Sequence, residues 1–197
     1  MLLLAFVSLP RPPKTLRAIG FDDAPFAKRH CAIVPIVGVV CAGTRFEGVV
    51  AGKVRKDGLS ATHEVERLLL GGKFLPQIHL VLFDGVAFGG FNVIDLERLA
   101  TTLKKPCVAV MRKAPDLAGV ERVIRTLPSP SRRLAMLHRA GEVHARPPFF
   151  FQVRGGDPDD IGEALERLTH IGHVPEALRI AHMIGGAMVN DVSGRRA

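Results

Sequence analysis

The segment "LVLFDGVAFGGFNVID" at residues 80–95 sets a carboxylate, Asp84, into a run of strand-forming apolar side chains. A buried aspartate is costly unless a partner compensates its charge. Two interpretations are open: the strand ends in a turn at Asp84-Gly85, or a cation binds there. Because Asp-Gly is a common turn signal, spacing alone favours the turn. The neighbours of this strand in the sheet therefore decide the role of Asp84.

Three apolar segments before residue 60 are typical of β-strands: 16–26, 32–43 and 45–58. The connection between the second and third is short enough for a hairpin, which predicts an antiparallel meander. Asp22 and Asp23 lie near the end of the first strand, ahead of Ala24-Pro25. Taken alone, this acidic pair is typical of a loop.

Helices and strands alternate after the meander. We expect a helix that begins with Ser60 or Thr62 as its N-cap and ends at Gly71, and a second helix capped by Asn92. The segment at 80–84 lies between them as a fourth strand, and residues 107–113 form a fifth. The order β-β-β-α-β-α-β predicts an α/β protein with a mixed sheet.

The rest of the chain is predicted to be mainly helical, at 116–127, 131–141, 157–172 and 175–189, with a strand or extended segment at 147–156. Asp157 is a candidate N-cap and Pro158 suits the first helical position. We expect a short N-terminal extension over 1–15, as a packed element or a frayed leader, and a single domain over 16–197. The apolar start of the extension is too short to span a bilayer and lacks signal-peptide features.

The chain is basic, with 27 Lys and Arg against 19 Asp and Glu, a formal charge of +8 and a pI near 10.0. Such a charge favours polyanionic partners such as nucleic acid. The basic residues are spread along the chain, however, so a merely soluble basic protein fits equally well. With no Trp or Tyr, base stacking would depend on Phe, His or Arg.

Three cysteines, Cys31, Cys41 and Cys107, lie in apolar segments without CxxC or Cys/His spacing. Neither a zinc site nor a disulfide framework is expected. Buried reduced thiols and a cytoplasmic location are the corresponding predictions.

Asp22 and Asp84 would converge if the first and fourth strands were neighbours, because adjacent strands lie about 4.8 Å apart. A right-handed crossover permits this pairing, but the pattern does not force it. Two close carboxylates must share a proton or bind a cation. Mg²⁺ prefers carboxylate oxygens together with water and substrate phosphate, which suits a basic protein acting on a polyanion.

Further candidates each have a structural alternative. Glu64 flanks the buried stripe of its helix, but a glutamate in a first helical turn is favourable in any protein. His182 lies at the edge of a polar stripe, a position typical of a boundary histidine. His170 and His173 lack partner ligands for a metal. The amides of Gly89-Gly90 suit a phosphate, although two glycines also let a strand turn into a helix.

Four motifs carry a family resemblance: "FDDAPF", "LFDGVAFGGFNVID", "VMRKAPD" and "PEALRIAHMI". In this order, between Leu16 and Val189, they resemble an uncharacterised, mainly archaeal family of endonuclease V-like proteins. The resemblance implies an RNase H-like mixed sheet of order 3-2-1-4-5, with helices on both faces and the first and fourth strands adjacent.

The resemblance also implies a metal-dependent nuclease that hydrolyses phosphodiester bonds in DNA or RNA. Metal, Mg²⁺ or Mn²⁺, would be held by Asp22, Asp84 and Glu64. His182 would orient water or shuttle a proton, and Arg112 and Lys113 would contact the nucleic-acid backbone.

Two departures from the family pattern bear on this function. The chain has His63 where the family has an acid after the residue matching Thr62, and Glu64 follows one place later. The Pro-Tyr-x-Pro-Gly wedge of endonuclease V has no counterpart between Val54 and Pro76, so its inosine specificity is not expected to transfer. A non-catalytic nucleic-acid-binding protein and an enzyme for a small phosphorylated substrate remain alternatives.

Overall fold

A computed structural model describes residues 6–11, 14–26 and 33–191. Its centre is a seven-stranded sheet of order β3-β2-β1-β4-β7-β9-β8. β1, β2 and β3 form the antiparallel meander, and β4 and β7 run parallel to β1. β9 runs antiparallel to β7, and β8 runs antiparallel to β9. The strands are β1 (Arg17–Asp23), β2 (Ile33–Ala42), β3 (Arg45–Arg55), β4 (Leu80–Asp84), β7 (Cys107–Met111), β8 (His144–Arg146) and β9 (Phe149–Arg154).

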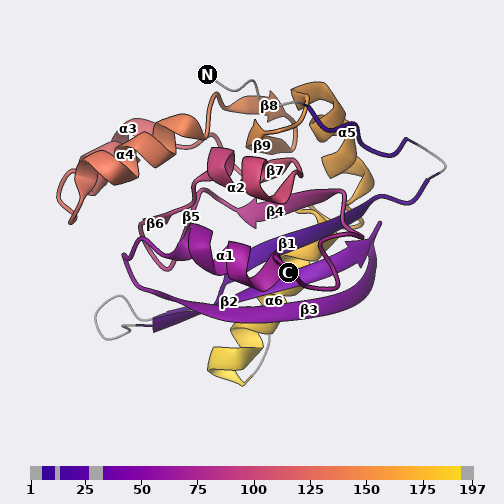
Figure 1. Ribbon diagram of the computed structural model, residues 1–197, viewed down its shortest axis with the longest axis horizontal. Coiled ribbons are helices and arrows are strands. Elements are labelled where there is room, and N and C mark those ends of the chain that lie inside the picture. Colours follow the sequence, from indigo (N-terminus) through magenta and orange to yellow (C-terminus); the bar gives the residue numbers. More distant parts are fainter. Residues whose placement is uncertain (1–5, 12–13, 27–32, 192–197) are drawn as a thin grey trace.

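Helices cover both faces of the sheet (Figure 1). α1 (Ala61–Leu69) and α2 (Leu96–Leu103) share a core with one face, whereas α5 (Pro158–Arg167) and α6 (Glu176–Asn190) pack on the other. α3 (Leu117–Ile124) and α4 (Pro130–Arg139) form a pair to one side of the sheet (Figure 1). The predicted mixed sheet, its order 3-2-1-4-5 and its two helical layers are confirmed.

Alternation along β1 divides the core between the two faces. Ile19 and Phe21 point towards α1 and α2, where Phe21 stacks on Phe83 of β4 with ring centroids 5.9 Å apart. Ala18 belongs to the opposite core, which α5 covers. Because side chains alternate with a period of two, Asp22 must point to the face of α6.

Gly20 lets α6 lie directly against β1. A Cβ atom at this position would be 2.6 Å from the backbone nitrogen of Leu178, a distance that no side chain tolerates. The close approach fixes how far the side chains of α6 reach across β1, and it therefore sets the position of His182.

The segment after β4 differs from its prediction. It forms a small hairpin, β5 (Ala87–Phe88) and β6 (Asn92–Val93), before α2 begins. Asp95 is the N-cap of α2 and accepts a hydrogen bond from the amide of Arg98, so the prediction that Asn92 caps this helix is wrong. The Asn92 side chain instead accepts from the amide of Ala61, at the start of α1.

The predicted start of α1 is confirmed at Ser60, which occupies the N-cap position but makes no capping hydrogen bond through its side chain. Thr62 Oγ1 accepts from the amide of Asp95. The first amide of α1 thus binds a side chain of β6, and the amide of Asp95, the N-cap of α2, binds a side chain of α1. These contacts depend on tertiary packing and leave no local signal in the sequence.

The C-terminal half contributes two further strands to the sheet, of which one was predicted. The segment at 147–156 contains β9, which pairs with β7, whereas β8 is only three residues long and was not predicted. Asp157 caps α5 and Pro158 is its first residue, as predicted.

Cys41 and Cys107 are buried free thiols, as expected. Cys31 and part of the predicted N-terminal extension lie outside the described residues. Within the described ranges, no helix is long and apolar enough to cross a membrane.

Candidate metal centre

The register of β1 and β4 brings the two aspartates together. The parallel ladder pairs Phe21 with Phe83, and Asp22 and Asp84 are the next residues on each strand. Asp84 ends β4, and Gly85 then turns the chain with a φ of +82°. The turn interpretation and the convergence of the carboxylates are thus both confirmed.

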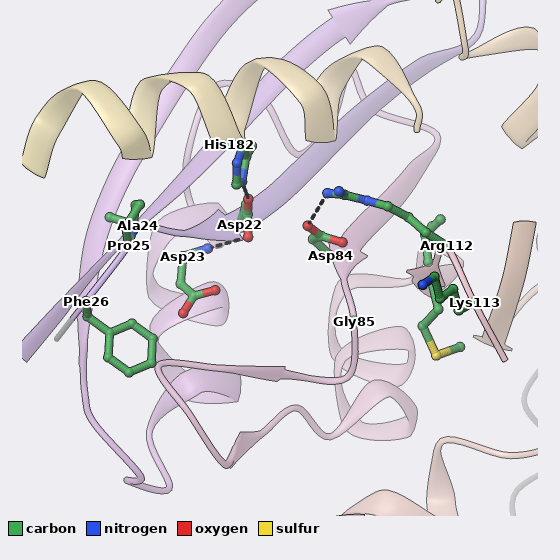
Figure 2. A pocket seen from close by; sticks show the side chains of 12 residues that line it. Asp22, Asp23, Ala24, Pro25, Phe26, Asp84, Gly85, Arg112, Lys113 and His182 are labelled. Carbon is green, nitrogen blue, oxygen red and sulfur yellow. Dashed lines mark hydrogen bonds and ion pairs between the residues drawn. The ribbon is translucent and has the colours of Figure 1, made fainter. Parts of the chain in front are cut away.

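His182 of α6 completes a three-residue group. Its Nδ1 lies 2.8 Å from Asp22 Oδ2, across 160 positions of sequence. One ligand atom from each of Asp22, Asp84 and His182 lies within 4.8 Å of the other two. Figure 2 shows His182 reaching down from its helix to Asp22, with Asp84 facing the same space from the neighbouring strand.

Burial and mutual repulsion make the acidic group electrostatically costly. Asp22 is 4% exposed, and desolvation, followed by the neighbouring Asp84 charge, raises its pKa to about 7, although the hydrogen bond from His182 opposes this shift. An Arg112 nitrogen lies 3.3 Å from Asp84 Oδ2 and offsets part of the negative charge. A bound cation would relieve the remaining repulsion.

Asp23 plays a part that the sequence did not indicate. Its Oδ2 accepts a hydrogen bond of 2.8 Å from the amide of Gly89, in the β5–β6 hairpin. Burial raises the pKa of Asp23. Because the amide of Gly89 is already bound to this carboxylate, the suggestion that it binds a phosphate is not supported. Asp23 positions the hairpin beside the candidate centre.

The group opens into a hollow of about 670 Å³. Arg112 and Lys113, the predicted backbone contacts, line the hollow, as do Asp23, Phe26 and Gly85 (Figure 2). Both basic residues follow β7 at the carboxyl edge of the sheet and are exposed. In open α/β sheets, this edge is where ligands bind.

Glu64 lies elsewhere, which corrects the placement that the resemblance implied. It lines a separate hollow beside Ala51 of the edge strand β3, and Ala51 is two strands away from Asp22 in the register. Its carboxylate accepts from the amide of Lys53 and from Arg67. Within the described ranges, the compact group thus contains two carboxylates and one imidazole.

The sequence model of the endonuclease dU family matches residues 14–189. The chain belongs to this family. A UPF0215 protein of Methanothermobacter thermautotrophicus is 35% identical over 178 residues, 88% of this chain and 87% of the relative. Another, from Deinococcus radiodurans, is 36% identical over 189 residues, 95% and 96% of the two chains. The relatives of this endonuclease dU family member thus include a bacterial protein.

Solved structures support the fold of the family. A protein of unknown function from Archaeoglobus fulgidus superimposes with a TM-score of 0.84 at 30% identity, covering 89% of this chain and 99% of that one. Endonuclease V from Ciona intestinalis, in complex with an inosine-containing DNA, gives a TM-score of 0.63 at 13% identity, over 95% and 92% of the chains. The endonuclease dU chain and endonuclease V therefore share a fold.

Proposed function

We propose that the chain is a divalent-metal-dependent nuclease that hydrolyses phosphodiester bonds in DNA or RNA. The observation that carries this proposal is the Asp22–Asp84–His182 group, which lies in an open hollow beside Arg112 and Lys113. The name of the family and the DNA complex of a protein with the same fold agree with it.

The donor set fits a divalent cation. Two carboxylates are the ligands that Mg²⁺ and Mn²⁺ prefer, and an imidazole nitrogen is available next to them. Burial and the neighbouring Asp84 charge raise the pKa of Asp22, and a bound cation would offset both effects. Asp22 and Asp84 would hold the ion, which when bound supplies Lewis-acid activation of water and of the phosphate.

The remaining side chains of the site are suited to binding the substrate and to transferring a proton during hydrolysis. Arg112 and Lys113 present exposed cations at the hollow, where they would bind phosphate oxygens and orient the strand. His182 is held through Nδ1 by Asp22, so its orientation is fixed and its other ring nitrogen is available to accept or return a proton. Hydrolysis adds a water oxygen to phosphorus, breaks one bond between phosphorus and a sugar oxygen, and returns a proton to that oxygen.

The test is cleavage of labelled single-stranded and duplex DNA and RNA by purified protein with Mg²⁺ or Mn²⁺, including strands that contain deoxyuridine or inosine. We expect Asp22→Asn and Asp84→Asn to lower the cleavage rate at least about 100-fold while circular dichroism shows a retained fold. Wild-type protein that cleaves none of these substrates, or variants that cleave as well as wild type, would contradict the proposal.

One observation favours a second candidate, a nucleic-acid-binding protein without catalysis. The compact group has only two carboxylates among the described residues, because Glu64 lies elsewhere. This candidate predicts salt-sensitive binding that is indifferent to added metal and to Asp22→Asn. Cleavage that is lost in Asp84→Asn would exclude it.

A further inference from the structure

A second hollow, of about 230 Å³, adjoins the candidate metal centre. The two hollows share Arg112 and His182 in their walls. The rest of the second wall comes from the segment between α5 and α6 and from the first turns of α6: Ile171, Gly172, His173, Val174 and Arg179. A ligand bound at the metal centre would therefore lie next to side chains that also line the second hollow.

Basic side chains supply the polar lining of this second hollow. Among the described residues, two arginines and two histidines contribute to the wall, and no carboxylate does. Arg179 is held in place by two bonds to the carboxylate of the buried Glu176, of 3.0 Å from Nε and 2.5 Å from Nη2, and its Nη1 also contacts Met183 Sδ. A fixed guanidinium beside two imidazoles suits a ligand rich in acceptor oxygens, such as a phosphodiester.

The apolar side chains that line the second hollow indicate a ligand that has an apolar part as well as a phosphate. Ile171 is 67% exposed, and Val174 lies beside it in the same wall. A large exposed aliphatic side chain next to cations offers contact area to a sugar or base while the cations bind its phosphate. The volume is below the roughly 300–1,000 Å³ of sites for drug-sized ligands, so the hollow suits one unpaired nucleotide rather than a base pair.

We infer that the second hollow binds the unpaired nucleotide next to the scissile phosphodiester, so that the substrate is a single-stranded or locally unpaired polynucleotide. The inference rests on the proposed nuclease function and adds a substrate class to it. It also gives a role to His173, for which the sequence indicated none, and separates it from His170, which does not line either hollow.

The test is equilibrium binding of fluorescein-labelled 15-nucleotide strands, single-stranded and as a duplex, measured by fluorescence anisotropy in EDTA, where metal-dependent cleavage cannot occur. We expect wild type to prefer the single strand, and Ile171→Ala/His173→Ala to weaken single-strand binding about tenfold. Both residues are exposed, so the fold should persist, and thermal denaturation checks this. The matched control is His170→Ala/Val123→Ala, which removes an imidazole and a branched aliphatic side chain at exposed positions outside the hollow and should bind within about twofold of wild type.

Unchanged single-strand binding by Ile171→Ala/His173→Ala would overturn the inference, and so would a wild-type preference for duplex. Either result can occur while metal-dependent cleavage is intact, in which case the proposed nuclease function stands. Wild type that binds neither form in EDTA would also overturn the inference, whereas the cleavage assay with metal decides the nuclease function separately. An equal reduction in the control variant would show that the effect is not specific to the hollow, and would also overturn the inference.

Discussion

At the scale of the residue, the ionisation of Asp22 connects stability to pH. Its pKa is raised from 3.8 to about 7, so the folded protein holds a proton that the unfolded chain releases above pH 4. The stability that this proton contributes is fully present below about pH 4 and is lost as the pH rises through 7. Ionised Asp22 is thus a destabilising group in the metal-free protein at neutral and alkaline pH.

Asp22→Asn removes this titration. We expect the melting temperature of the variant in EDTA to exceed that of wild type by several degrees at pH 8, because the amide needs no compensating cation. The difference should shrink as the pH falls from 7 to 4, where wild-type Asp22 is also neutral. Differential scanning fluorimetry across pH 4–8.5 measures it, and a difference that does not vary with pH would contradict this account of Asp22.

The affinity of the site for metal should depend on pH in the opposite direction to the stability of the metal-free protein. Binding requires an ionised Asp22, so the association constant for Mn²⁺ should rise with pH, up to about tenfold per unit below pH 7, and level off above it. Isothermal titration calorimetry at pH 6, 7 and 8 measures this slope. Asp84→Asn should bind weakly at every pH, whereas Glu64→Gln, which changes a carboxylate outside the group, should bind as wild type does. Weakened binding in Glu64→Gln would contradict the observed placement.

At the scale of the element, Arg133 of α4 joins three segments that the sequence does not relate. Its buried guanidinium donates to four backbone carbonyls, of Asp57, Gly58, Phe91 and Pro128. It thereby ties α4 to the turn after β3 and to the β5–β6 hairpin. All four of these hydrogen bonds go to backbone carbonyls, which the fixed fork of the arginine can reach together, and the nearby charge of Asp57 also favours the guanidinium.

Arg133→Lys should therefore destabilise the protein, because one ammonium group cannot reach four carbonyls in this arrangement. We expect a decrease of about 2–4 kcal/mol in the free energy of unfolding, measured by urea denaturation. The neighbouring Arg132→Lys, at an exposed position, should change it by less than about 0.5 kcal/mol. Equal effects of the two substitutions would show that the junction carries little stability.

Gly20 tests the packing of α6 on β1. Gly20→Ala places a methyl group against the backbone of Leu178, and we expect a decrease of about 1–3 kcal/mol in unfolding free energy. The added methyl group should push α6 away from β1 and so move His182 away from Asp22. The affinity of the site for Mn²⁺ should therefore fall in parallel. Urea denaturation and calorimetry on the same samples measure both effects. Unchanged metal binding would show that the packing of α6 on Gly20 does not control the metal site.

Patterns among residues close in the sequence correctly predicted the structural features that such residues determine. Apolar alternation, Asp157-Pro158 and Asp84-Gly85 marked strands, a helix start and a turn correctly. They did not reveal that Asn92 accepts a hydrogen bond from the first amide of α1, because that bond joins residues 31 positions apart. The three-residue strand β8 is too short to show a period.

At the scale of the whole molecule, the sequence alone indicated an acidic pair but could not complete the site. The adjacency of β1 and β4, and the choice of His182, came from the family resemblance, since no local pattern encodes a contact across 160 positions. Glu64 was misplaced because a helical wheel gives the face of a helix but not the strand that the face covers. Asp23 looked like a loop acid, although its carboxylate faces the hairpin.

The net charge of +8 predicts a strong dependence of nucleic-acid binding on salt. Neutralising one side chain that binds a phosphate should reduce the slope of log affinity against log salt concentration by about 1. Arg112→Gln/Lys113→Gln should lower this slope by up to about 2, and Lys73→Gln, on the loop before β4 and in neither hollow, should change it much less. Anisotropy titrations at increasing NaCl concentration measure the slope. If the slope of Arg112→Gln/Lys113→Gln equals that of wild type, neither residue binds a phosphate.

The contact between Asp22 and His182 has a consequence for biosynthesis. Asp22 leaves the ribosome 160 positions ahead of its imidazole partner. The meander of β1, β2 and β3 can pair as it emerges, but the site stays open on one side until α6 docks over Gly20. A nascent chain that has not yet reached α6 thus carries the acids without their histidine, and the centre is completed only after that helix has been translated.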